Sequence, residues 1–194
     1  MESIKAFFRD SRVIAACRQD TFAAATESAA AMVLLMNATL TWLVRPEFQE
    51  LRQRKPVLIH IDLVKGLAGD RESVTFLRDF IQPWGIVSTK SATIRAARKM
   101  GVPAIQRVFL IDSTSLRTSI DSIRENAPVA VELMPGLAPA PITEIRDAVG
   151  LPVIAAGLIR TREHALTALD AGADAISMSA TSLWNEPLLT DPLP

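Results

Sequence analysis

The stretch LPVIAAGLIRTREHALTALDAGADAISM, residues Leu151–Met178, holds two apolar runs with a helical segment between them. The runs, Leu151–Ala156 and Asp174–Met178, are nearly continuous in apolar residues, as in strands that are covered on both faces. The helical segment closes at Gly172, because glycine takes the left-handed conformation at a helix C-terminus without a Cβ clash. A strand–helix–strand unit of this kind predicts two parallel strands joined by a right-handed crossover.

The same unit repeats along the whole chain. Two more junctions, Gly101-Val102-Pro103 and Gly150-Leu151-Pro152, combine a helix-ending glycine with a proline that stops the helix. Amphipathic segments such as Ser91–Met100 and Pro141–Gly150 lie between the apolar runs. The expected strands are Arg12–Cys17, Ala31–Met36, Val57–Asp62, Gly85–Thr89, Ala104–Ile111, Val129–Leu133, Leu151–Ala156 and Asp174–Met178.

Eight such units predict a small TIM-like (β/α)₈ barrel formed by a single domain, residues 1–194. Typical barrels of this class have about 250 residues, so we expect one or two helices to be short or missing. An open doubly wound sheet is the alternative, although no Gly-x-Gly-x-x-Gly loop follows an early strand to favour its dinucleotide-binding form. Residues 186–194 contain three prolines and are expected to form a loose C-terminal tail.

The composition is that of a globular domain, with 49% hydrophobic and 22% charged residues. The 21 basic and 21 acidic residues give a net charge of zero, which argues against a uniformly cationic, nucleic-acid-binding surface.

The single cysteine, Cys17, excludes an intrachain disulfide and favours a reducing compartment, the cytoplasm. The charge-free stretch Ser28–Val44 is too short and too polar for a membrane span, and the N-terminus does not resemble a signal peptide.

Polar residues gather where the third and fourth expected strands end, which is where a parallel barrel places its site. His60 and Asp62 share strand parity, and Lys65 and Gly66 follow them in the loop. These groups suit a polyol phosphate or acid–base catalysis, although His60 and Asp62 could equally form a structural pair.

The fourth strand ends with hydroxyls beside an ammonium group, at Ser88 and Lys90. This combination suits an anion, and Lys90 could act as a Schiff-base lysine if it were desolvated. The alternative is that the hydroxyls cap the next helix.

Gln106 and Arg107 have opposite parity in the fifth strand, so only one of them can point into the barrel. We expect Arg107 to point inward and to meet either Glu132 or a ligand phosphate, because a buried charge needs a partner. A divalent cation on Asp62, Asp112 and Glu132 is a weaker alternative, and no zinc-type spacing of Cys and His exists. We expect neither a metal nor a cofactor.

Small residues end the last two strands, with Gly157 after the seventh and Ser177 and Ser179 at the eighth. Many barrels bind phosphate at this position through backbone N–H groups. We therefore expect phosphate binding here, the alternative being that small residues are needed only for packing.

Several runs together resemble the glycerol uptake operon antiterminator regulatory protein family. The match spans about Val57–Asn185 and is only topological before it. The last run also occurs in phosphosugar isomerases and indole-glycerol-phosphate synthase. The runs are HIDLVKGL (His60–Leu67), GIVSTK (Gly85–Lys90), AIQRVFLID (Ala104–Asp112), VELMPG (Val131–Gly136) and AAGLIRTREHALTALDAGADAISMSATSLWN (Ala155–Asn185).

The resemblance implies a cytoplasmic bacterial regulator with a TIM-barrel-like fold and no enzymatic reaction. Its members respond to glycerol 3-phosphate and bind leader mRNA, which prevents premature termination in glycerol-utilisation operons. Motif position and the barrel rim together predict a ligand pocket lined by His60, Asp62, Lys65, Gly66, Ser88, Lys90, Arg107, Glu132, Gly157, Ser177 and Ser179.

Two other functions remain open. One is a small phosphate-binding barrel enzyme, with isomerase- or aldolase-like activity on a phosphosugar or triose phosphate. The other is a metabolite-binding regulator that acts through a protein and not through RNA. A homo-oligomer is compatible with each of them.

The zero net charge hides a local asymmetry. No acidic residue lies between Asp79 and Asp112, whereas Arg95, Arg98 and Lys99 fall there at spacings that share a helix face. We predict that these three residues contact RNA; the alternative is a solvated helix face.

Overall fold

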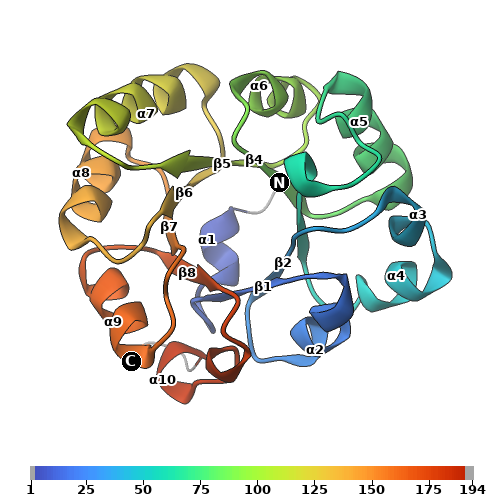
Figure 1. Cartoon of the computed structure of the whole chain (residues 1–194), viewed down its shortest axis with the longest axis horizontal. Helices are drawn as coiled ribbons and strands as arrows, with labels where there is room; N and C mark the ends of the chain where they lie inside the picture. The colour runs from blue at the N-terminus through green and yellow to red at the C-terminus, as the bar shows by residue number, and fades with distance from the viewer. Residues whose placement is uncertain (1–2, 191–194) are drawn as a thin grey trace.

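The apolar runs become the eight strands of a closed parallel barrel in the computed structural model, which describes residues 3–190 (Figure 1). Nearly all strand positions are buried, which explains why the runs lack polar alternation. Each strand lies within two residues of its expected bounds. The strands are β1 Val13–Cys17, β2 Met32–Leu35, β3 Val57–His60, β4 Gly85–Ser88, β5 Ala104–Phe109, β6 Ala130–Met134, β7 Val153–Ala156 and β8 Ala175–Met178.

The first and last strands close the barrel. Ala15 of β1 is in register with Val33 of β2 on one side and with Met178 of β8 on the other. The remaining strands pair in sequence order. This closure confirms the (β/α)₈ barrel and excludes the open doubly wound sheet.

Helices surround the strands, and those near the ends of the chain are short, as the length of the chain predicts. More than two are short, because α2, α3, α4 and α10 have six residues or fewer. The helices are α1 Ile4–Phe7, α2 Phe22–Glu27, α3 Leu40–Leu43, α4 Pro46–Leu51, α5 Arg71–Phe76 (continued by a π-type turn, Leu77–Ile81), α6 Ser91–Lys99, α7 Ser113–Asn126, α8 Pro139–Val149, α9 Arg162–Asp170 and α10 Pro187–Thr190.

Helix α1 closes one end of the barrel. Ile4 and Phe8 pack in the inner core cluster with inward-facing side chains such as Met32, Leu58 and Ala130. These side chains lie near the N-terminal ends of their strands, and Figure 1 shows α1 within the strand ring. The C-terminal ends of the strands are therefore the open end of the barrel.

The segment expected to be a loose tail begins instead with α10. Pro187 stands at the first position of this helix, where its missing N–H costs nothing. Leu189 is buried, and its carbonyl accepts a hydrogen bond of 3.0 Å from the backbone N–H of Arg12. The loose-tail prediction is wrong for this part, and residues 191–194 lie outside the described residues.

The charge-free stretch Ser28–Val44 contains strand β2 and helix α3, as its polar interruptions predict. Among the residues that the structure describes, no helix combines the length and apolarity needed to cross a membrane.

Candidate functional site

Arg107 points into the barrel and forms a buried ion pair, as predicted. Its Nε lies 2.6 Å from Glu132 Oε2, and the two side chains are only 6% and 2% exposed. Gln106 points outward, where its amide hydrogen-bonds Ser122 Oγ at 2.9 Å and Asn126 Nδ2 at 2.9 Å. The alternation of side chains along β5 thus places one polar residue in the barrel and the other against α7.

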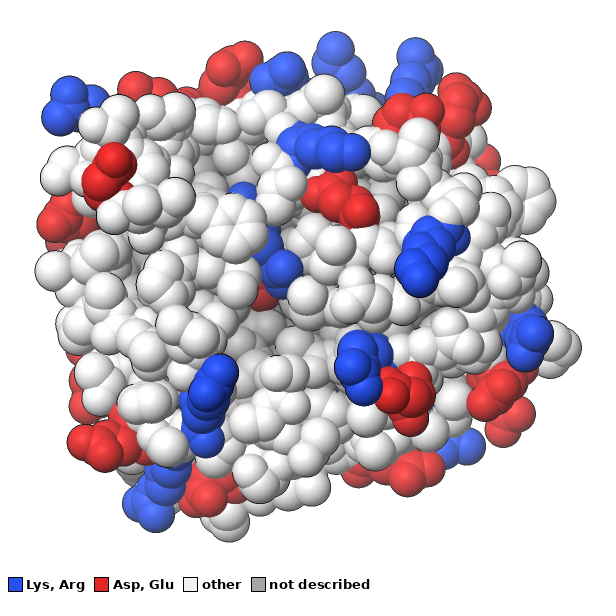
Figure 2. Space-filling view, in the orientation of Figure 1, with Lys and Arg blue, Asp and Glu red and all other residues white. Residues whose placement is uncertain are grey.

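A cavity of about 410 Å³ lies at the open end of the barrel, lined in part by the ion pair. Figure 2 shows a hollow near the centre of this face, with basic and acidic atoms inside it. The cavity brings together five of the residues expected in a ligand pocket: Arg107, Glu132, Gly157, Ser177 and Ser179.

The wall formed by the end of β7 has an unusual backbone. Gly157 and Leu158 both have positive φ angles, of 75° and 62°. The positive φ angle favours glycine at position 157, because L side chains rarely adopt this conformation. Leu158 is 55% exposed beside the cavity. Because Gly157 has no side chain, a ligand in the cavity can approach the backbone of this turn closely.

His60 is buried in the barrel and has an unpaired nitrogen. Its side chain is 2% exposed, and Nδ1 has no hydrogen-bond partner within the described structure. Burial, reinforced by the positive charge of Arg107, lowers the pKa of His60 to about 4 against the opposing effect of Asp62. His60 is therefore neutral at pH 7.

The side chain of Asp62 does not point in the same direction as that of His60, contrary to the prediction from strand parity. Strand β3 ends at His60, and Ile61–Leu63 forms a 3₁₀ turn that breaks the alternation of side chains. The Asp62 carboxylate accepts hydrogen bonds from Ser88 Oγ at 2.9 Å and from the Thr89 backbone N–H at 2.8 Å. It joins the turn after β3 to the end of β4, and neither Asp62 nor Ser88 lines the cavity.

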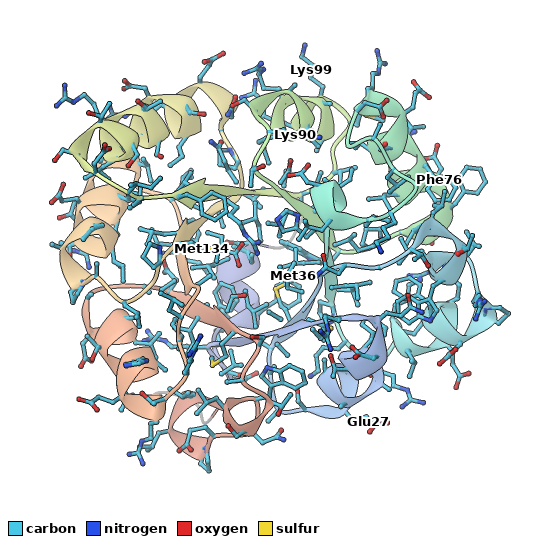
Figure 3. All side chains as sticks on the ribbon, viewed as in Figure 1. Glu27, Met36, Phe76, Lys90, Lys99 and Met134 are labelled. Atoms are coloured by element: carbon cyan, nitrogen blue, oxygen red, sulfur yellow. The ribbon has the colours of Figure 1, made fainter. Side chains whose placement is uncertain are left out.

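Lys90 also lies outside the cavity lining. It precedes α6, and its Nζ donates to the Ala68 carbonyl at 3.2 Å. Figure 3 shows Lys90 beside α6, whereas Met36 and Met134 lie inside the ring of strands. The lysine is exposed, so it lacks the desolvation that a Schiff-base lysine needs.

Lys65 and Gly66 belong to a loop that pairs with the segment after β2. The Lys65 N–H donates to the Ala38 carbonyl at 2.9 Å, and the Lys65 carbonyl accepts from the Leu40 N–H at 2.9 Å. Gly66 has a φ of 100°, and a Cβ there would lie 3.0 Å from Leu40 Cβ. Their position in the loop explains why the sequence pattern placed them near the site, but neither lines the cavity.

The three residues predicted to contact RNA all lie on α6. Arg95 and Lys99 line a groove beside α5, whereas Arg98 lies near Ala104, at the N-terminal end of β5. Arg95 also donates to Glu125 Oε1 at 3.2 Å. Contact between these residues and RNA stays a prediction.

The carboxylates considered for a divalent cation have different roles. Asp112 caps α7 by accepting from the Ser115 N–H at 2.7 Å, while Asp62 and Glu132 bind Ser88 and Arg107. Within residues 3–190, no group of three or more His, Cys, Asp and Glu is placed to hold a metal.

A model of the family described as "Glycerol-3-phosphate responsive antiterminator" matches residues 13–184. The chain belongs to the glycerol-3-phosphate responsive antiterminator family. The match includes β1 and β2, so membership extends beyond the motifs that carried the resemblance. It supports a regulatory role in antitermination.

Solved structures agree with this assignment. The glycerol uptake operon antiterminator regulatory protein of Listeria monocytogenes is 31% identical, with a TM-score of 0.83 over 89% of this chain and 94% of that one. A glycerol uptake operon antiterminator-related protein of Thermotoga maritima is 30% identical, with a TM-score of 0.78 over 90% and 98%.

Two further likenesses add less about function. The uncharacterized protein YgcP of Escherichia coli is 32% identical over 67% of this chain and 68% of its own length. Deoxyribose phosphate aldolase of Aeropyrum pernix is 17% identical, with a TM-score of 0.68 over 96% and 97% of the two chains, and shows the fold alone.

Some cavity residues were missed by sequence reasoning. Met36 follows β2 and Met134 ends β6, and both lie inside the barrel. Met134 stands two residues after Glu132, so the alternation along the strand could have identified it. Arg160 lines the cavity from the loop after β7, three residues beyond Gly157. Its position beside the expected phosphate site was the available signal.

Proposed function

We propose that the chain is a cytoplasmic antiterminator that binds glycerol 3-phosphate in the barrel cavity and leader mRNA of glycerol-utilisation operons on its surface. The observation that carries the ligand proposal is the buried Arg107–Glu132 pair, which lines a cavity next to Gly157, Ser177 and Ser179. The family assignment supports the regulatory part.

The phosphate group is assigned to the side of the cavity formed by Gly157, Ser177 and Ser179. Loops after the seventh and eighth strands bind phosphate in many barrels, and Arg160 adds a positive charge to the same cavity. A volume of about 410 Å³ falls within the usual range of small-molecule sites, roughly 300–1,000 Å³.

The glycerol hydroxyls are assigned to the buried Arg107–Glu132 pair in the cavity lining. Glu132 lines the cavity and can accept hydrogen bonds, whereas neutral His60 lies outside the cavity lining, with a buried nitrogen that has no hydrogen-bond partner among the described residues. Asp62, Lys65, Gly66, Ser88 and Lys90 would act on the ligand indirectly, by ordering the loop after β3.

The regulatory step is a coupling between two binding events. If glycerol 3-phosphate orders the loops at the mouth, and RNA binds that ordered state better, each ligand strengthens the binding of the other. A typical coupling free energy of about 1–3 kcal/mol corresponds to a change in affinity of roughly 5- to 150-fold.

Calorimetry tests the ligand site. Glycerol 3-phosphate should bind the wild-type chain, whereas glycerol should not, and inorganic phosphate should bind more weakly. The double variant Ser177→Ala/Ser179→Ala should weaken binding by about tenfold, because two hydroxyl hydrogen bonds are lost. Ser113→Ala on exposed α7 is the matched control. Equal binding by both variants, or none by the wild type, would contradict the assignment.

The enzyme alternative has less support. The aldolase likeness shows the fold alone, and Lys90 is exposed with its Nζ donating to the Ala68 carbonyl. Borohydride treatment in the presence of phosphosugars should therefore trap no adduct on Lys90. An adduct found at Lys90 by mass spectrometry would favour the enzyme.

A further inference from the structure

A groove between α5 and α6 is lined by three cations. Arg71, Arg95 and Lys99 form it together with the small or flexible side chains of Ala92, Ala96 and Met100, and its volume is about 340 Å³. None of these lining residues is acidic. Figure 3 places Lys99 at the outer edge of the molecule, far from Met36 and Met134. The groove is therefore separate from the ligand cavity.

The positive charge in this groove is only partly neutralised. Arg71 and Lys99 are exposed, and no residue of the described chain forms an ion pair with either of them. Arg95 is held by Glu125 Oε1 at 3.2 Å and Asn126 Oδ1 at 2.8 Å, and its side chain stays 39% exposed. These two contacts hold the Arg95 guanidinium in place, while Arg71 and Lys99 form no ion pair within the described chain.

We propose that this α5–α6 groove binds the sugar–phosphate backbone of RNA. Arg71 and Lys99 would contact phosphates, while Ala92 and Ala96 allow the backbone to approach closely. A protein partner is disfavoured, because protein interfaces have an apolar core and Met100 is the single large apolar residue in the lining. The inference rests on the proposed RNA binding and replaces Arg98 of the sequence prediction with Arg71.

The groove is linked to the ligand end of the barrel through the loop between β3 and α5. This loop follows His60 and ends where Arg71 begins α5. Two of its carbonyls accept hydrogen bonds from the other wall of the groove: Ala68 from Lys90 Nζ, and Gly69 from Thr93 Oγ1. Helices α5 and α6, which form the two walls of the groove, are therefore both attached to this loop. We expect a ligand bound near His60 to order the loop.

The test compares Arg71→Gln/Lys99→Gln with Arg98→Gln. Arg98 is a matched control, because it is an exposed cation on the same helix that does not line the groove. Binding of leader RNA is measured by fluorescence anisotropy between 50 and 200 mM salt, with saturating glycerol 3-phosphate. The groove variant should bind about tenfold more weakly, and its salt slope should fall by about 1.4, at roughly 0.7 per phosphate contact for a single strand.

The control should stay within about twofold of the wild type. Both variants should fold, because the three substituted side chains are exposed and surface substitutions cost little stability. Thermal melting checks this, and Lys99→Gln alone is a second groove variant. Equal RNA binding by the groove and control variants would overturn the inference about the groove but would leave the proposed function standing. A wild-type chain that binds no RNA would overturn the proposed function.

Discussion

Glu132 and Arg107 carry opposite charges inside an otherwise largely apolar barrel. Desolvating two charges is costly, and their mutual attraction in the interior offsets this only when the pair is intact. The sequence allowed this pairing to be predicted, because a charged residue within an apolar strand needs a partner. The cavity that the pair lines could not be predicted, since its wall also includes Met36 and Met134, which belong to parts of the chain far apart in sequence.

Breaking this pair should destabilise the fold. Glu132→Gln leaves the Arg107 charge buried and unpaired, which should lower the free energy of unfolding by about 3 kcal/mol. Arg107→Met/Glu132→Leu should recover most of this loss, because neither charge remains. Urea unfolding of the three chains measures both effects. A double variant that is no more stable than Glu132→Gln would contradict this account of the pair.

His60 should make stability depend on pH. Its pKa of about 4 in the fold lies below the ordinary value of 6.5, so the unfolded chain binds the proton more readily between these values. Stability should therefore fall as the pH drops from about 6.5 to about 4, by up to about 3 kcal/mol.

His60→Gln removes this contribution. The variant should lose less stability than the wild type between pH 7 and pH 4.5, measured by urea unfolding. Parallel stability curves for the two chains would show that His60 is not responsible. The sequence placed His60 at the strand end, but its neutral state depends on burial and then on the charge of Arg107, which need the three-dimensional structure.

At the scale of elements, the sequence was enough to predict the strands but not the short helices α1 and α10. A buried parallel strand is an apolar run, so its sequence is enough to find it. Helix α1 and helix α10 are four residues each, and a pattern this short has no helical period to detect. Their roles depend on what they cover: α1 closes the barrel, and α10 packs beside the chain before β1.

The packing of α10 gives an element-level prediction. Leu189 is 2% exposed, whereas its neighbour Leu188 is 54% exposed. Leu189→Ala should lower the free energy of unfolding by about 2–3 kcal/mol. Leu188→Ala, which makes the same chemical change on the exposed side, should stay within about 0.5 kcal/mol of the wild type. Equal effects of the two substitutions in urea unfolding would show that α10 is not packed in solution.

At the scale of the whole molecule, zero net charge is compatible with two charged regions of different kinds. The Arg107–Glu132 pair has no net charge and lines the cavity inside the barrel, whereas Arg71 and Lys99 are exposed in a groove between helices. The sequence indicated a basic stretch on α6. It could not show that α5 supplies Arg71 to the same groove, because this requires the two helices to be neighbours.

The central claim is that glycerol 3-phosphate and RNA bind one chain at two coupled sites. The most direct measurement is the dissociation constant of leader RNA, by anisotropy at fixed salt, with and without saturating glycerol 3-phosphate, and with inorganic phosphate as the control. We expect glycerol 3-phosphate to tighten RNA binding by about 5- to 150-fold and phosphate to have little effect. Equal RNA affinity with and without glycerol 3-phosphate would contradict the account.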